Sequence, residues 1–200
     1  MDVSAETAVL AGGCAWIMQQ LLRHPDGVIS TRTGFMGGVN DNPTEEDNNG
    51  HAEVVEVIFD PERLSYRGLL EVFFLGHRPD LDEEIVGSKY RSEIFYTSPE
   101  QQRVAEDMIR DVDASAHWPG KAVTKIGEAG VFWEMGPEDQ DVLMRFPHGC
   151  KPPFPHRETS PGDKSGRRPA FVTAPLRIRF AAEKQCPPAS PFRARRRVAP

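Results

Sequence analysis

The stretch AVLAGGCAWIMQQLL, residues 8–22, joins a short apolar run, a glycine pair, a cysteine and a segment with helical spacing. The apolar residues 8–11 are typical of a buried strand, and residues 15–22 favour a helix with Trp16 one turn from Gln19 and Gln20. The chain must therefore turn from a strand into a helix at residues 12–14. Two glycines allow this sharp turn and leave room for another group to approach the backbone closely.

The following 110 or so residues continue this mixture of strands and helices. Period-two alternation or β-rich composition predicts strands at 28–35, 51–59, 91–96 and 122–126, and apolar stripes predict helices at 65–75 and 99–114. In the second of these strands, Glu53 shares a face with Val55, Val57 and Phe59. Interspersed elements of both kinds indicate an α+β or α/β chain with a mixed sheet and helices packed on it.

The charges and prolines of the 200-residue chain divide it at about residue 155. Residues 151–200 hold 12 of the 24 Lys and Arg, 3 of the 30 Asp and Glu, and 10 of the 18 prolines. Proline at this density blocks regular structure, and few large apolar side chains remain to offset the entropy of ordering. We therefore expect one folded, acidic domain at 1–155 and a basic, mostly disordered tail at 156–200.

Residues 171–180 are a possible exception in the tail, since their alternation favours a short strand, against which Pro175 argues. The basic tail is expected to be a solvated extension. Contact with its own acidic domain is an alternative, and we do not expect nucleic-acid binding.

The three cysteines, Cys14, Cys150 and Cys186, lie far apart in the sequence. This spacing excludes a dense disulfide framework and a four-thiolate zinc site, and it suits a reducing compartment such as the cytoplasm. No apolar run approaches the roughly 18 residues of a membrane span. The first residues lack the basic region of a secretory signal.

Cys14 is the residue with the clearest chemical content. Its place at the start of a helix brings its thiol close to unpaired backbone N–H groups, which stabilise the thiolate. Since the thiolate is the nucleophile, this position favours reactivity near neutral pH. The alternative is a buried, inert cysteine at a strand–helix turn.

The motif GGCAW at 12–16 resembles the Gly-Cys-Phe-Trp signature of the peptide methionine sulfoxide reductase A family. The similarity continues in order through residues 6–150, in PDGVISTRTGFMGG at 25–38, NPT at 42–44, GHAEVVEVIFDP at 50–61, LLEVFFLGH at 69–77, KYRSEIFY at 89–96 and WPGKAVTKI at 118–126. The fold that this resemblance implies is α+β, a mixed sheet with packed helices around a ferredoxin-like (split βαβ) core.

The resemblance also implies an activity and a set of site residues. Cys14 would attack the sulfur of methionine S-sulfoxide, Trp16 would line the pocket, and Glu53 and Tyr90 would bind and protonate the sulfoxide oxygen. Cys150 would resolve the resulting sulfenic acid as a disulfide that thioredoxin reduces, and Cys186 is a less favoured candidate. No metal or organic cofactor is needed, and no membrane partner is expected.

This chemistry agrees with what the residue types can do. A carboxyl buried against Trp16 stays protonated and can donate to a poor leaving oxygen, and a phenol can hydrogen-bond the same oxygen. A sulfenic acid condenses readily with a second thiol. Without the family pattern, Glu53 is equally compatible with a solvated strand end and Tyr90 with a core aromatic. His51 is expected to be a structural hydrogen-bonding residue.

The chain departs from the family pattern at several positions of the expected pocket. The substituted residues are Ala15 for a phenylalanine, Ile17 for a glycine, Gln19 for an acid, Phe35 and Glu45 for tyrosines, and Ile85, beside Glu84, for an acid. Ala15 and Phe35 are still expected to line the substrate pocket. Each lost hydrogen bond to the developing charge lowers a rate by about two orders of magnitude. The chain is therefore either a divergent reductase, which we favour, or a weak or inactive relative that serves as a binding module.

Overall fold

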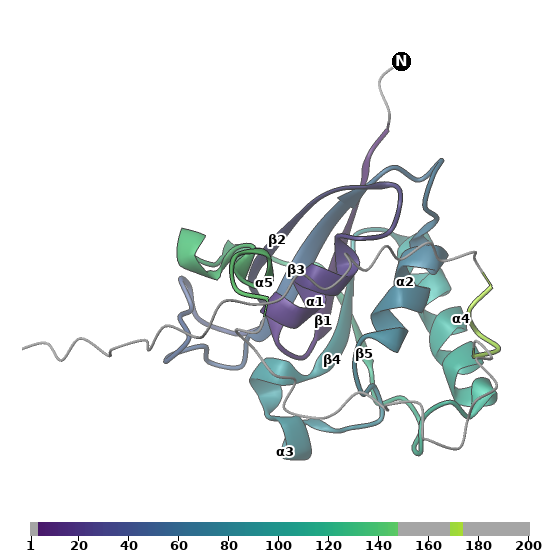
Figure 1. The fold of residues 1–200 in the computed structure, drawn as a ribbon. Helices are drawn as coiled ribbons and strands as arrows, with labels where there is room; N and C mark the ends of the chain where they lie inside the picture. The colour runs from purple at the N-terminus through teal and green to yellow at the C-terminus, as the bar shows by residue number, and fades with distance from the viewer. Residues whose placement is uncertain (1–3, 148–168, 174–200) are drawn as a thin grey trace, which may run out of the picture.

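The computed structural model describes residues 4–147 and 169–173. A six-stranded sheet lies at its centre, with the strand order β5-β4-β1-β3-β2-β6 (Figure 1). The strands are β1 (Glu6–Gly12), β2 (Val28–Met36), β3 (Ala52–Phe59), β4 (Ser92–Tyr96), β5 (Lys125–Glu128) and β6 (Trp133–Glu134). All neighbouring strands run antiparallel except β4 and β5, which run parallel, so the sheet is mixed as predicted.

Six of the regular elements form a split βαβ core. Their order along the chain is β1, α1 (Ala15–Leu22), β2, β3, α2 (Tyr66–Leu75) and β4. Two short helical turns lie between α2 and β4, and only turns and loops connect the others. The sheet places β1 between β3 and β4, with β2 outside β3. β1 and β2, which α1 connects, therefore have β3 between them. β3 and β4, which α2 connects, have β1 between them. This arrangement confirms the ferredoxin-like core expected from the sequence.

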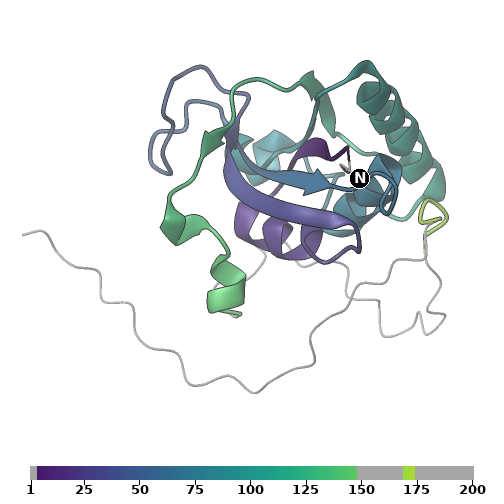
Figure 2. The ribbon, with the colours of Figure 1, turned by 90° about the horizontal axis from the view of Figure 1, so that it is seen from above.

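Three helices, α1, α2 and α4 (Pro99–Ser115), pack on one face of the sheet (Figures 1 and 2). The predicted stripe of α2, which includes Leu69, Leu70 and Phe73, is fully buried against Leu10 and Val57 of the strands. Burial of each such side chain contributes about 1.5–3 kcal/mol. A smaller apolar cluster lies on the opposite face. Within the described residues, no helix has the length and apolar character needed to cross a membrane.

The predicted elements agree with the structure to within three residues at each end. The largest shift is in the strand predicted at 122–126, which occurs as β5 three residues later. Residues 122–124 have other partners, since the Ala122 N–H donates to Asp113 Oδ1 at 2.7 Å and the Val123 N–H to the Pro79 carbonyl at 2.8 Å. The sequence did not predict the shortest elements, which are α3 (Glu83–Val86), η1 (Ser88–Tyr90), β6, η2 (Pro137–Asp139) and α5 (Val142–Arg145).

Five residues of the predicted tail, 169–173, lie against the helical layer. Phe171 is 2% exposed and belongs to the main core, where its ring meets that of His117 edge to face. The backbone N–H and the hydroxyl of Thr173 donate to the buried Glu71 carboxylate at 3.0 and 2.7 Å. These five residues are therefore packed in a turn and not in a strand, which differs from the expectation for the tail. The rest of residues 156–200, and Cys150, lie outside the described residues.

Candidate active site

Cys14 lies where the central strand β1 passes into α1. Gly13, with φ +93°, makes the turn, and Cys14 precedes the first helical residue, with its carbonyl accepting from the Met18 N–H at 3.1 Å. Gly12 permits close packing at the end of β1, because a Cβ there would lie 2.5 Å from Met18 Cε and 2.7 Å from Phe73. Cys14 is partly exposed. The predicted position of the thiol at a helix N-terminus is therefore present.

Glu53 reaches this helix N-terminus from the neighbouring strand β3. Its carboxylate oxygen Oε2 accepts a hydrogen bond of 2.8 Å from the backbone N–H of Ala15, the residue after Cys14. Glu53 is 4% exposed, and its strand partner is Phe35 on β2, which is 3% exposed. The sheet register thus brings a buried carboxyl to the residue that follows the thiol.

The environment of Glu53 raises the pKa of its carboxyl to about 7. Burial is the largest cause, because it disfavours the charged form, and the negative charge of Glu45 adds to it. The Ala15 hydrogen bond and the Lys89 ammonium lower the pKa and only partly oppose these effects. Near neutral pH, a large fraction of Glu53 is therefore protonated and able to donate.

Lys89 links the carboxyls of Glu45 and Glu53 and lies against Tyr90. Its ammonium is 2.6 Å from Glu45 Oε2, 3.5 Å from Glu53 Oε1 and 4.9 Å from the Tyr90 ring centre. Burial and the charge of Glu53 raise the pKa of the Tyr90 hydroxyl, while Lys89 opposes them. The hydroxyl of Tyr90 consequently stays protonated and can act as a donor, and Tyr90 is half-buried within electrostatic range of Glu53.

Trp16 and Asp139 contribute another side of the site. Trp16 is half-buried in the first turn of α1, and it lowers the pKa of the Asp139 carboxyl in η2, which indicates that the two side chains lie near each other. Burial raises the pKa of Asp139, and the charges of Glu138 and Glu45 raise it further. The charge of Glu45 thus raises the pKa of both the Glu53 and the Asp139 carboxyl.

The structure thus places Cys14, Ala15 and Trp16 at the N-terminus of α1 and binds the Glu53 carboxyl to the Ala15 N–H. Lys89, which lies against the ring of Tyr90, is 3.5 Å from that carboxyl. Ala15 is 1% exposed and contributes its N–H to Glu53 rather than an apolar wall. With this geometry a thiolate can attack a bound electrophile while a neutral carboxyl donates a proton to it.

Comparison with known proteins agrees with this arrangement. The sequence model of a family described as "Peptide methionine sulfoxide reductase" matches residues 6–158. The chain belongs to the peptide methionine sulfoxide reductase family. A relative from Nocardia farcinica named peptide methionine sulfoxide reductase MsrA is 55% identical over 153 residues, covering 74% of this chain and 90% of its own length. A relative of the same name from Mycolicibacterium vanbaalenii is 51% identical over 164 residues, with 80% of this chain and 95% of that protein covered.

Solved structures of methionine sulfoxide reductases share the fold. Methionine sulfoxide reductase A of Corynebacterium diphtheriae superposes with a TM-score of 0.63 at 26% identity, covering 74% of this chain and 78% of that one. Mxr1 from Saccharomyces cerevisiae in reduced form gives a TM-score of 0.65 at 22% identity, with coverage of 76% and 92%.

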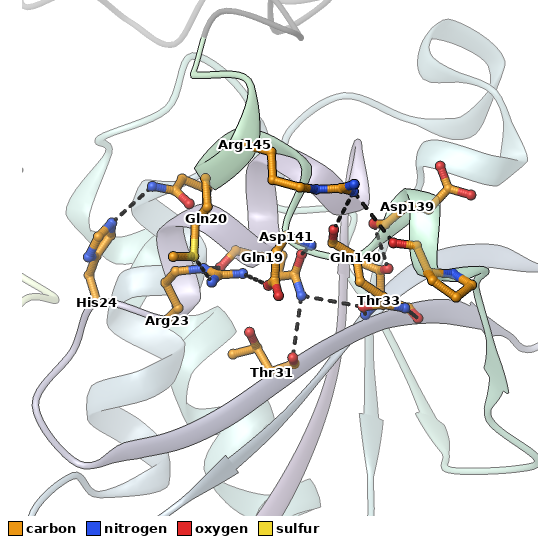
Figure 3. A network of polar contacts seen from close by, with 12 residues as sticks. Gln19, Gln20, Arg23, His24, Thr31, Thr33, Asp139, Gln140, Asp141 and Arg145 are labelled. Carbon is orange, nitrogen blue, oxygen red and sulfur yellow. Dashed lines mark hydrogen bonds and ion pairs between the residues drawn. The ribbon is translucent and has the colours of Figure 1, made fainter. Parts of the chain in front are cut away.

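The structure also shows the surroundings of Gln19, His51 and Ile85, three other positions considered in the sequence. Gln19 is buried, accepts from the Asp141 N–H at 2.9 Å and donates to the Thr31 carbonyl at 3.3 Å (Figure 3). His51 is buried with its Nε2 2.9 Å from the Asn40 carbonyl, which agrees with the structural role expected for it. Ile85 is 59% exposed. The two hydrogen bonds of Gln19 therefore link α1 to β2 and to Asp141 in this methionine sulfoxide reductase fold.

Sequence reasoning missed two members of the site, Lys89 and Asp139. Lys89 directly precedes Tyr90 in the KYRS motif. The sequence therefore already placed a cation next to a residue that was expected to bind the sulfoxide oxygen. Asp139 carries no such signal, because it lies about 120 residues after Trp16 in a three-residue helical turn. Glu45 was seen only as a substitution for a tyrosine, and its ion pair with Lys89 needs the fold to become visible.

Proposed function

We propose that the chain is a thiol-dependent peptide-methionine (S)-S-oxide reductase in which Cys14 is the nucleophile and Glu53 the acid. The observation that carries this proposal is the 2.8 Å hydrogen bond that holds the Glu53 carboxyl at the residue after Cys14, with a pKa of about 7. A neutral carboxyl at this place matches the need of a sulfoxide oxygen, which leaves only after protonation.

In the proposed reaction, the Cys14 thiolate attacks the sulfoxide sulfur. Glu53 protonates the oxygen, assisted by a hydrogen bond from Tyr90. The sulfoxide S–O bond breaks and the protonated oxygen leaves as water. A water molecule then adds to the Cys14 sulfur while the bond between that sulfur and the methionine sulfur breaks, so methionine is released and Cys14 becomes a sulfenic acid. The substrate sulfur has gained two electrons and the cysteine sulfur has lost two. Trp16 and Phe35 border the apolar part of the pocket.

Recycling in this proposal uses Cys150 and thioredoxin. The Cys150 thiol displaces water from the sulfenic acid and forms a disulfide with Cys14, which a dithiol such as thioredoxin then reduces. Cys150 follows the last described residue of this part of the chain, Pro147, by three residues, a span of at most about 10 Å. Peptide mapping of oxidised protein is expected to show a Cys14–Cys150 bridge, and a Cys14–Cys186 bridge would assign the role to Cys186.

A single-turnover assay tests the catalytic proposal. Reduced protein without added reductant is mixed with the S-sulfoxide or the R-sulfoxide of methionine, and the methionine formed is measured. We expect about one equivalent per chain from the S form, none from the R form, and none from Cys14→Ser. The variant Cys186→Ser is the matched control and should retain the burst.

The alternative of an inactive binding module predicts no methionine from the parent protein, or equal amounts from Cys14→Ser. The geometry favours the enzyme, since three separate segments contribute to one region: the start of α1 with its thiol and indole, β3 with a buried carboxyl, and η1 with a phenol. A cytoplasmic location remains a prediction from the cysteine usage.

A further inference from the structure

Lys89 occupies a defined place beside the carboxyl of Glu53. Glu53 Oε2 accepts from the Ala15 N–H, so the second oxygen, Oε1, is the one left to carry the proton. The Lys89 ammonium lies 3.5 Å from this same Oε1. Because the side chains of Glu53 and Lys89 are only 5% and 20% exposed, water screens the interaction between their charges only in part.

Glu45 binds this ammonium from the loop before β3. Its Oε2 lies 2.6 Å from Lys89 Nζ, and the ring centre of Tyr90 lies 4.9 Å from the same nitrogen. Lys89 is thus closer to Glu45 than to Glu53, and Glu45 compensates part of its charge. The ion pair keeps the ammonium near Glu53 Oε1 without giving it wholly to Glu53.

The groups that face Glu53 come from four segments of the fold. They are Glu45 on the loop before β3, Lys89 and Tyr90 on η1, Cys14 at the start of α1 and the uncharged Phe35 on β2. Burial raises the pKa of Glu53 most and Glu45 raises it further, while the hydrogen bond from α1 and the charge of Lys89 lower it. Lys89 is the cation of this group.

Glu45 also acts on a second acid, Asp139 of η2. Burial raises the pKa of Asp139, and the charges of Glu138 and Glu45 raise it further. This turn is held on β2, because the Thr33 hydroxyl donates to the Asp139 carbonyl at 3.1 Å. The Gln140 amide accepts from the Thr33 N–H at 2.8 Å and donates to the Thr33 carbonyl at 2.9 Å (Figure 3). A titration of the site must therefore separate glutamate from aspartate.

We propose that Lys89, held by its ion pair with Glu45, is a positioning residue whose ammonium stabilises the carboxylate left on Glu53 when Glu53 gives its proton to the sulfoxide oxygen. This inference rests on the proposed function for that step. The Oε1–H bond breaks, the proton joins the sulfoxide oxygen and the electron pair stays on Oε1. A cation 3.5 Å away favours this charged product over the neutral acid. Glu45 limits the effect, because an uncompensated ammonium would ionise Glu53 before the substrate arrives.

Carbon-13 NMR of the Glu53 carboxyl tests the charge coupling without any need for activity. Labelling of glutamate alone excludes aspartate signals, and Glu53→Gln assigns the relevant one. Lys89→Gln should move the titration midpoint to a pH about one unit higher, and Glu45→Gln should move it lower by about the same amount. Lys89→Arg keeps the charge, so its midpoint should stay within about half a unit of the parent. Lys125→Gln, which removes the cation of an ion pair on β5, is the matched control and should leave the midpoint in place.

The single-turnover assay tests the catalytic part. Lys89→Gln should lower the rate constant of methionine formation at pH 6 about tenfold, because the carboxylate product loses its cation. Alkylation of Cys14 at the same pH corrects for any change in its thiolate fraction.

The two measurements fail in different ways. Midpoints that stay with the parent, or that move in the same direction in Lys89→Gln and Glu45→Gln, overturn the proposal, since they would make the ion pair purely structural. An unchanged rate constant in Lys89→Gln, with its midpoint moved, overturns the stabilising role in proton transfer. No methionine from the parent, with both midpoints moved as expected, rejects the proposed function but not the charge coupling.

Discussion

Replacement of Glu53 by glutamine should change how the stability of the protein depends on pH. The folded protein holds the pKa of Glu53 at about 7, against an ordinary value of 4.5. Between these two pH values the unfolded chain has lost the proton and the folded chain has kept it. The free energy of unfolding must therefore fall as pH rises through this range, and the loss is complete above pH 7.

The size of this effect follows from the pKa difference. One pKa unit corresponds to about 1.4 kcal/mol, so the ionised Glu53 destabilises the fold by about 3 kcal/mol above pH 7. Glu53→Gln has no proton to lose and keeps an oxygen that can accept from the Ala15 N–H. Its stability relative to the parent should rise by about that amount between pH 4.5 and 7.5.

Urea unfolding at half-unit steps from pH 4.5 to 8 measures this difference. Titration of other groups is common to both proteins and cancels in the comparison. Glu62→Gln, which removes an exposed carboxyl, should run parallel to the parent over the whole range. A Glu53→Gln curve that also runs parallel to the parent would refute the reasoning, because it would mean that burial does not hold Glu53 neutral. The same variant should lose about 10²–10⁴ in kcat, because the acid is gone.

Four further substitutions, the last of them a control, probe the site and the fold. Tyr90→Phe removes a protonated donor and should lower kcat about 10²-fold in the methionine-forming assay, and an unchanged kcat would remove Tyr90 from the reaction. Phe171→Ala should cost about 3 kcal/mol in urea unfolding, because it empties a site in the main core, and a cost below about 0.5 kcal/mol would mean that residues 169–173 do not pack there. Gly38→Ala would place a Cβ 2.1 Å from His51 Cδ2 and 2.4 Å from its backbone nitrogen, so we expect loss of folding by circular dichroism. Gly130→Ala, with nothing within 4 Å, should fold normally.

The parts of the fold that the sequence predicted are those with a repeated apolar pattern. The stripe of α2 and the alternation of β3 each extend over at least eight residues, and packing confirms both. The turns that carry Asp139 and Tyr90 have three residues each, too few for any periodicity. Their positions depend on partners far along the chain, such as Thr33 for residues 139 and 140.

The position of Cys14 at a helix N-terminus could be predicted, because it depends only on neighbouring residues in the sequence. The pKa values of the site could not be predicted. A cysteine between a strand and a helix has its chemistry fixed by its neighbours in sequence. The pKa of Glu53 depends instead on burial, on Glu45 and on Lys89, which only the folded chain brings together. Residues 171–173 belong to the stretch that was expected to be an exception within the tail, but they pack in a turn and not in a strand, with Phe171 buried in the core.

The amide of Gln140 has a consequence for solubility. Strand β2 has nine residues, but β6 pairs with only two of them along its outer side, which would leave a long row of backbone groups open to strand addition by another chain. By occupying both backbone groups of Thr33, Gln140 interrupts this row at its buried part. Gln140 thus shields this part of the border of the sheet against self-association.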